Sequence, residues 1–276
     1  MKTNLRHMLF LAALVVLMVL FAFPLVWMLS YSLRPLGLPE PTRLELFTRP
    51  LALDNYARLG SVIPLGTFTL NSLRVVALAV PLTVLTASWA GFALAQLPRR
   101  ITALLLTLSV ALLLVPSPSL WVPRFLIFTE LDWVDTLAPL IAPALMGTSP
   151  FYVIMFTIAF ARLPRDVVES ARLDGAHVLT TWAAIAMPLV RPTVVAVTLL
   201  SFAFYWSDYV SPLLYLRAEA NYTLPVGIQL LQQAYKSNWP LLMAAAVVMV
   251  APVVLFFVSI QRWFLQGQIA LSRWLR

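Results

Sequence analysis

The chain contains no cysteine among its 276 residues and has only two histidines and two lysines. The missing cysteine excludes disulfide bonds, thiolate chemistry and cysteine metal sites. His7 and His177 are far apart and do not have the spacing of a metal site. No Gly-x-x-x-x-Gly-Lys-Ser/Thr sequence is present to cradle nucleotide phosphates. We therefore expect no metal, no cofactor and no catalytic residue on this chain, and any nucleotide hydrolysis must take place on another chain.

Charged residues are also scarce. They make up 11% of the sequence, hydrophobic residues make up 61%, and the mean hydropathy is +0.89. Such a chain is too apolar to cover a water-soluble surface, which indicates a membrane protein with several spans. Five windows lack charge altogether and a sixth contains one acid; the windows are residues 8–33, 75–98, 101–123, 136–161, 237–261 and, with Asp208, 192–216.

Each window can hold the roughly 20 apolar residues that a bilayer-crossing helix needs. The sequence therefore predicts an all-α membrane protein in which residues 1–276 form a single transmembrane domain. The long apolar run at the start is not followed by a small-residue cleavage site, so we expect it to stay as an anchor. Six transmembrane helices are expected, at approximately residues 8–33, 70–97, 101–122, 137–161, 193–215 and 241–261.

The basic residues indicate how these helices are oriented. An even number of spans places both termini on one side, together with the Arg99-Arg100 turn and the loop after the fourth span. On the opposite side the loops are longer, and their basic residues are accompanied by most of the acids. The positive-inside rule therefore predicts that both termini are cytoplasmic. The net charge of +8 is dispersed over loops instead of clustered, so no nucleic acid partner is expected.

Proline interrupts two of the predicted spans. Pro116 and Pro118 remove backbone donors and are expected to end or bend the third helix before Trp121. The fourth span contains three prolines beside the sequence Gly-Thr-Ser at 147–149. Broken, small and polar residues at membrane depth need protein or water around them, so we expect this helix to face the interior.

A long polar interruption covers residues 162–192, between the fourth and fifth spans. Pro164 fits the start of a helix, and the acids that follow it lie at the positive end of the helix dipole. This helix is predicted to run to about Leu173, because Gly175 can adopt the left-handed conformation that ends helices. A second helix is expected from Ala176 to Met187, until proline turns the chain back into the membrane. The pattern predicts two short helices along the cytoplasmic membrane surface.

Two interpretations of this loop are open. One is an amphipathic connector whose charged side chains are simply solvated. The other is a docking surface for a second protein. Ser170, Ala171 and Gly175 are small enough for another backbone to approach closely, and a carboxylate at Glu169 would suit a charged partner.

The order of residues in the loop carries a family resemblance. Glu-Ser-Ala at 169–171 is followed by Asp-Gly-Ala at 174–176, then by Ile185 and Pro188. This pattern resembles the cytoplasmic loop of permease subunits in bacterial ABC importers. Asn-Ser-Leu at 71–73 and Ala-Leu-Ala at 93–95, with FAFYWSDYVSPLLYL, YTLPVGIQLL and NWPLLMAAAVVMVAPVVLFFVSIQRWFLQG, look like the carbohydrate branch, in particular the smaller maltose-type permease subunit.

The resemblance implies a type I ABC importer permease in the bacterial inner membrane. Its implied partners are a second homologous permease subunit in a heterodimer, an ATPase dimer that binds ATP and Mg²⁺, and an extracytoplasmic sugar-binding protein. The sequence departs from the family pattern at Ser170, where alanine is usual, and in the tail after Gly267, so no tail contact with the ATPase is carried over. The residues implied to dock on the ATPase are Glu169, Ser170, Ala171, Asp174, Gly175, Ala176, Ile185 and Pro188.

Asp208 is the acid within the fifth predicted span, about 16 residues from its start, or roughly 24 Å at helical rise. An ionisable residue at membrane depth suggests a function, and a carboxylate beside aromatic faces suits sugar hydroxyls. The alternative is an acid that reaches the outer interface within an aromatic belt. The candidate substrate-pathway residues are Trp206, Ser207, Asp208 and Tyr209.

We therefore predict a transmembrane permease subunit of an ATP-driven sugar importer that is not itself an enzyme. Permeases for polyols, glycerol phosphate or amino acids are alternatives, because no residue reads out ring size, linkage or charge. A channel or membrane enzyme outside the ABC group would require a polar stripe along a span, or an intramembrane cluster of His, Asp or Glu. The sequence shows neither.

Overall fold

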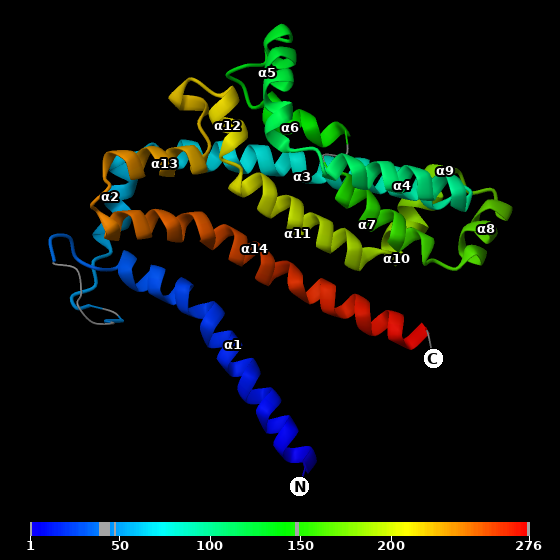
Figure 1. Ribbon diagram of the computed structural model, residues 1–276, viewed down its shortest axis with the longest axis horizontal. Coiled ribbons are helices and arrows are strands. Elements are labelled where there is room, and N and C mark those ends of the chain that lie inside the picture. The colour runs from blue at the N-terminus through cyan, green and yellow to red at the C-terminus, as the bar shows by residue number, and fades with distance from the viewer. Residues whose placement is uncertain (1, 39–44, 47, 147–148, 275–276) are drawn as a thin grey trace. The chain divides into compact units, whose positions relative to one another are not determined.

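The computed structural model describes the chain from residue 2 to residue 274, except for residues 39–44, 47 and 147–148 (Figure 1). In this part of the chain all regular secondary structure is helical. The chain folds into two compact units, Met1–Gly66 with Gly227–Pro252 and Thr67–Val226 with Val253–Arg276. α13 (Leu224–Ala234) and α14 (Trp239–Trp274) each run from one unit into the other.

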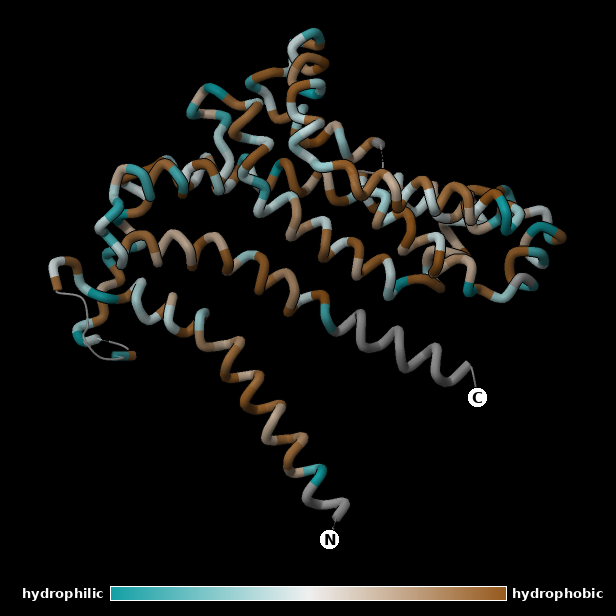
Figure 2. Tube along the Cα trace, in the orientation of Figure 1, coloured by the Kyte–Doolittle hydropathy of each residue, from teal (hydrophilic) through white to brown (hydrophobic). Residues whose placement is uncertain are grey.

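The first unit contains α1 (Lys2–Ser32) and α2 (Asp54–Val62). α1 is hydrophobic along nearly all of its described length, and most of its apolar side chains are exposed (Figure 2). A helix that is apolar all round is buried in protein or in lipid, so this exposure is what a membrane span requires. The buried Asn55 amide fixes α2 to the end of α1, where it donates hydrogen bonds to the carbonyls of Ser32 (2.8 Å) and Arg34 (2.9 Å).

Four helical stretches are long and apolar enough to cross a membrane: Arg6–Ser32, Leu65–Ala95, Ala138–Ala161 and Trp239–Gln261. Two pairs of helices meet the same requirement only together, and each pair is bent: Arg99–Leu113 with Ser117–Glu130 by 92°, and Val178–Leu189 with Arg191–Ser207 by 86°. The described residues therefore offer four to six spans. The number six and the cytoplasmic position of the termini stay predictions.

The core of the second unit joins α3 (Leu65–Ala95), α7 (Pro150–Ala161) and α11 (Arg191–Ser207). Gly91 lets α3 approach α7 closely, because a Cβ atom at this position would lie 2.5 Å from the Cβ of Phe156 and 2.9 Å from the backbone nitrogen of Thr157. Beside this contact, the rings of Phe92 and Phe160 meet edge to face at 5.3 Å. α7 is the second half of the fourth predicted span, and these buried residues confirm that it faces the interior of the unit.

Three of the predicted spans are interrupted. The third bends as the prolines predict: α4 (Arg99–Leu113) ends before Pro116, and η1 (Ser117–Leu120) leads into α5 (Trp121–Glu130). The fourth begins as α6 (Ala138–Ile141) and η2 (Ala142–Met146), while Gly147 and Thr148 lie outside the described residues. In the fifth, α11 ends at Ser207, Asp208 is extended, and α12 (Val210–Tyr215) follows. The fifth span is therefore not one continuous helix.

Candidate functional site

The first helix of the 162–192 loop forms almost as predicted. α8 (Arg165–Leu173) begins directly after Pro164 and has Asp166 in its first turn. Gly175 adopts φ +75°, and its amide donates to the Arg172 carbonyl at 3.0 Å. The next amide, that of Ala176, donates to the Ala171 carbonyl at 2.9 Å. These two bonds form a Schellman motif, which confirms that the glycine ends the helix.

One side of α8 is exposed, and the other side packs against the rest of the chain. Ala171 is buried, whereas Glu169, Ser170 and Asp174 are exposed. The side chain of Leu173 is 88% exposed at the end of the helix. Leu173 therefore lies on the exposed side of α8 together with Glu169, Ser170 and Asp174. The sequence pattern did not single out Leu173, because a leucine in an amphipathic helix is ordinarily assigned to the buried side.

The second half of the loop is helical from residue 178 to residue 189, close to the predicted range. α9 (Val178–Thr180) and α10 (Met187–Leu189) flank a π-helix, η3 (Thr181–Ala186). Ile185 is half-buried, Pro188 is exposed, and Ala186 belongs to the core cluster. The chain then turns by 86° into α11. Ala186 therefore packs in the same buried cluster as Val190 and Val197 at the start of α11.

Trp182 is a further anchor of the π-helix. Its ring meets that of Trp89 on α3 edge to face, with 5.6 Å between the centroids. Its indole Nε1 is buried and has no hydrogen-bond partner among the described residues. Short π-helical turns are frequently found at functional sites.

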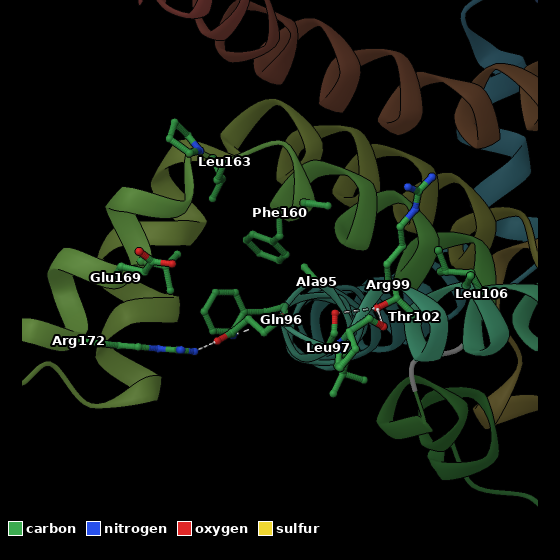
Figure 3. Close-up of a pocket in the computed structure, with 16 residues that line it drawn as sticks. Ala95, Gln96, Leu97, Arg99, Thr102, Leu106, Phe160, Leu163, Glu169 and Arg172 are labelled. Atoms are coloured by element: carbon green, nitrogen blue, oxygen red, sulfur yellow. Dashed lines mark hydrogen bonds between the residues drawn. The ribbon is translucent and has the colours of Figure 1, made fainter.

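A cavity of about 740 Å³ lies beside α8 (Figure 3). Its walls come from the turn between α3 and α4, from the end of α7 and from α8. The Arg172 guanidinium reaches across from α8 and donates a hydrogen bond to the side-chain oxygen of Gln96 (Figure 3). Thr102 closes the α3–α4 turn with a hydrogen bond to the Leu94 carbonyl at 2.9 Å. α8 is therefore tied to the α3–α4 turn by a side chain that also lines the cavity.

The four candidate pathway residues lie at the other end of α11, about 24 Å from its start at 1.5 Å per residue. The Trp206 ring is 1% exposed and stacks on Phe202. Ser207 is exposed, and Asp208 and Tyr209 are half-buried. One Asp208 carboxylate oxygen accepts a hydrogen bond from the Ser211 amide at 3.1 Å. This carboxylate therefore has a local structural role at the break between α11 and α12, and α11 separates it from the candidate docking residues.

Sequence inspection missed Asp135, which fastens the loop after α12. Its carboxylate oxygen accepts hydrogen bonds from the backbone amides of Arg217 and Ala218, both at 2.9 Å. The Asn221 amide donates to the same oxygen at 3.2 Å and to the Asp135 carbonyl at 2.6 Å. The side chain of Asn71 holds this loop from α3, with a bond to the Ala220 carbonyl at 2.8 Å. Loop residues 217–222 are thus fixed from two directions.

Replacing Asp135 with asparagine is expected to speed amide hydrogen exchange at Arg217 and Ala218 by roughly five-fold, because a charged acceptor binds more strongly than a neutral one. The amides of Arg217 and Ala218 hold the pKa of the Asp135 carboxyl below its ordinary 3.8. Its stabilising effect is therefore complete above pH 3.8 and is lost as the pH falls through the lowered value. Asp132→Asn is the matched control, since Asp132 also has a positive φ but makes no such bonds among the described residues. Equal exchange in both variants would contradict the assignment.

Comparisons with known proteins agree on one family. Residues 79–269 match the model of the family described as binding-protein-dependent transport system inner membrane component. A sulfoquinovosyl glycerol transport system permease protein of Agrobacterium fabrum is 33% identical over 252 residues, which are 89% of this chain and 86% of that protein. An arabinooligosaccharides transport system permease protein of Bacillus subtilis is 29% identical over 256 residues, 91% and 90% of the two chains.

Two further matches cover almost the full length. A trehalose/maltose transport system permease protein of Thermococcus litoralis is 27% identical over 268 residues, 95% of each chain. The structure also resembles a chain of a bacterial ABC transporter involved in the import of the acidic polysaccharide alginate, with a TM-score of 0.76 and 19% identity over 95% of this chain and 98% of that one. At this identity the structural likeness shows the fold.

Proposed function

Because the chain belongs to the family of binding-protein-dependent transport system inner membrane components, we propose that it is the permease subunit of an ATP-driven importer that carries a sugar across the bacterial inner membrane. Three similar permeases are named for saccharides or a sugar glycoside, which favours a sugar over a polyol, glycerol phosphate or amino acid. The chain crosses the membrane six times with both termini in the cytoplasm. A second permease completes the translocation path, and an extracytoplasmic binding protein delivers the solute.

The exposed side of α8 carries this proposal. Glu169 and Leu173 present a carboxylate and an apolar side chain to a partner, while Ala171 packs inward. The partner is an ATPase dimer, which binds ATP and Mg²⁺ and receives this helix together with Asp174, Gly175 and Ala176. Ile185 and Pro188 belong to the segment that leads from the docking helix into α11. Closure of the ATPase therefore moves α11 and opens or shuts the path.

The break between α11 and α12 is the part of this chain that meets the solute. Ser207 is exposed there, and half-buried Asp208 and Tyr209 follow it. Asp208 keeps one carboxylate oxygen for a solute hydroxyl, since the Ser211 amide occupies the other. Buried Trp206, which stacks on Phe202, fixes the end of α11 directly before this break.

Purification of the tagged chain from native membranes tests the proposed function. We expect a second permease and an ATPase to co-purify, and ATP hydrolysis to rise when the cognate binding protein and its sugar are added. Thermal shift of that binding protein with a panel of sugars and polyols identifies the solute class. A chain that purifies alone, is stable alone and recruits no ATPase would contradict the importer, and would favour a self-contained channel.

A further inference from the structure

The cavity beside α8 changes character along its length. Gln96 and Arg172 form a polar wall, and Arg99 lies at the start of α4 on the far side (Figure 3). Further along α4, Ala103 and Leu106 continue the lining with apolar groups. Its volume of about 740 Å³ lies within the range of roughly 300–1,000 Å³ found for ligand pockets. The occupant that fits is therefore itself polar at one end and apolar at the other.

The charges of the lining favour an anion. Arg99 and Arg172 are the cations of the lining and Glu169 is its acid. Arg172 bonds to the neutral amide of Gln96, and neither arginine forms an ion pair with a carboxylate in the described part of the chain. α4 also begins at Arg99 without a side-chain cap, which leaves the positive end of its dipole open. Two cations against one acid leave an excess positive charge on the lining as a whole.

The depth of the cavity favours a lipid over a free phosphate. From Arg99 to Leu106 the helix rises about 10 Å. The cavity is therefore much longer than a phosphate ion bound at Arg99 would need. None of the residues of α4 is buried, so its apolar surface is open to acyl chains. Basic pockets between transmembrane helices on the cytoplasmic side are suited to anionic lipid head groups.

We propose that this cavity binds an anionic phospholipid of the cytoplasmic leaflet, with the head group at Arg99 and an acyl chain along Ala103 and Leu106. The proposal rests on the proposed function, because it needs residues 162–192 to face the cytoplasm. Because both the α3–α4 turn and α8 line the cavity, a lipid in it contacts both segments. It thereby stabilises the docking helix, so ATPase coupling depends on the anionic lipid content of the membrane.

Lipid retention by the purified importer complex tests this site. Complexes are reconstituted in nanodiscs of phosphatidylcholine with increasing phosphatidylglycerol, and bound lipid is measured by native mass spectrometry. Arg99→Gln is expected to weaken phosphatidylglycerol retention about five-fold or more, and Ala103→Trp to weaken it by filling the apolar end. Arg100→Gln is the matched control, because Arg100 is the next residue and does not line the cavity.

Three outcomes would overturn the lipid site: equal retention by the Arg99 and Arg100 variants, unchanged retention by Ala103→Trp, or displacement of the lipid by millimolar inorganic phosphate. Co-purification of the second permease with each variant shows that the permease pair has formed, so loss of the lipid is not caused by loss of the fold. If the ATPase is recruited but retention is unselective, only the lipid site fails. If no ATPase is recruited by the wild-type chain, the proposed function fails instead.

Discussion

Replacing Gly91 with alanine is expected to destabilise the assembled protein by about 3 kcal/mol, the upper part of the usual range for overpacking. The added Cβ would lie 2.5 Å from the Cβ of Phe156 and 2.9 Å from the backbone nitrogen of Thr157. Both atoms are close to or part of the main chain of α7, so no side-chain rotation relieves the contact. The two helices must separate, and the core around them loosens.

Thermal unfolding of the purified complex and its yield from membranes measure this effect. Gly66→Ala is the control on the same helix, because a Cβ atom there meets nothing within 4 Å and alanine favours a helix over glycine. Removing the ring by Phe156→Ala should not rescue Gly91→Ala, because alanine keeps the Cβ atom that the new side chain would clash with. A Gly91→Ala complex as stable as the Gly66→Ala complex would show that α3 and α7 do not pack as described.

Gly175→Val is expected to uncouple the ATPase while leaving the core intact. The residue has φ +75°, and a left-handed conformation costs a residue with a Cβ roughly 1–2 kcal/mol, which lowers the population of the docking conformation about 5- to 30-fold. A Cβ atom at this position would meet nothing within 4 Å, so the cost of adding it comes from the backbone conformation. Without the Schellman bonds from Gly175 and Ala176, the end of α8 and Leu173 lose their fixed direction.

ATPase co-purification and binding-protein-stimulated ATP hydrolysis report this loss. Gly175→Asn is the matched control, because asparagine tolerates the left-handed region better than valine, and it should retain most of the coupling. Combining Gly175→Val with Glu169→Ala should abolish recruitment. The docking proposal would be refuted by a double variant that binds the ATPase as well as the wild-type chain.

Features that depend on neighbouring residues could be predicted from the sequence. Pro116 ends the third helix because its ring removes a donor, and Gly175 ends α8 because it alone accepts the positive φ at low cost. The helical character and the interior position of α7 also follow from local composition. The number of spans does not, since two candidate spans are bent pairs whose angle depends on packing.

Features that depend on distant residues could not be predicted. Asp135 accepts hydrogen bonds from the amides of Arg217 and Ala218, which are 82 and 83 positions away in the sequence. No local sequence pattern predicts such bonds. The hydrogen bond beside the cavity links Arg172 to Gln96, which is 76 positions away in the sequence. The sequence could identify the candidate docking residues, but not that Trp206 is packed inward or that Leu173 is left outside.

The π-helix at Thr181–Ala186 makes the length of the loop as important as its composition. Each residue in a helix turns the chain by about 100° around the axis. One residue added or removed within the 178–189 helix would therefore rotate the residues before it by about 100° around the helix axis relative to the residues after it, even if every contacting side chain were kept. Substitutions there change the strength of a contact, whereas insertions and deletions change the direction in which the surface points. The proposed coupling therefore constrains the number of residues in this stretch as well as their identity.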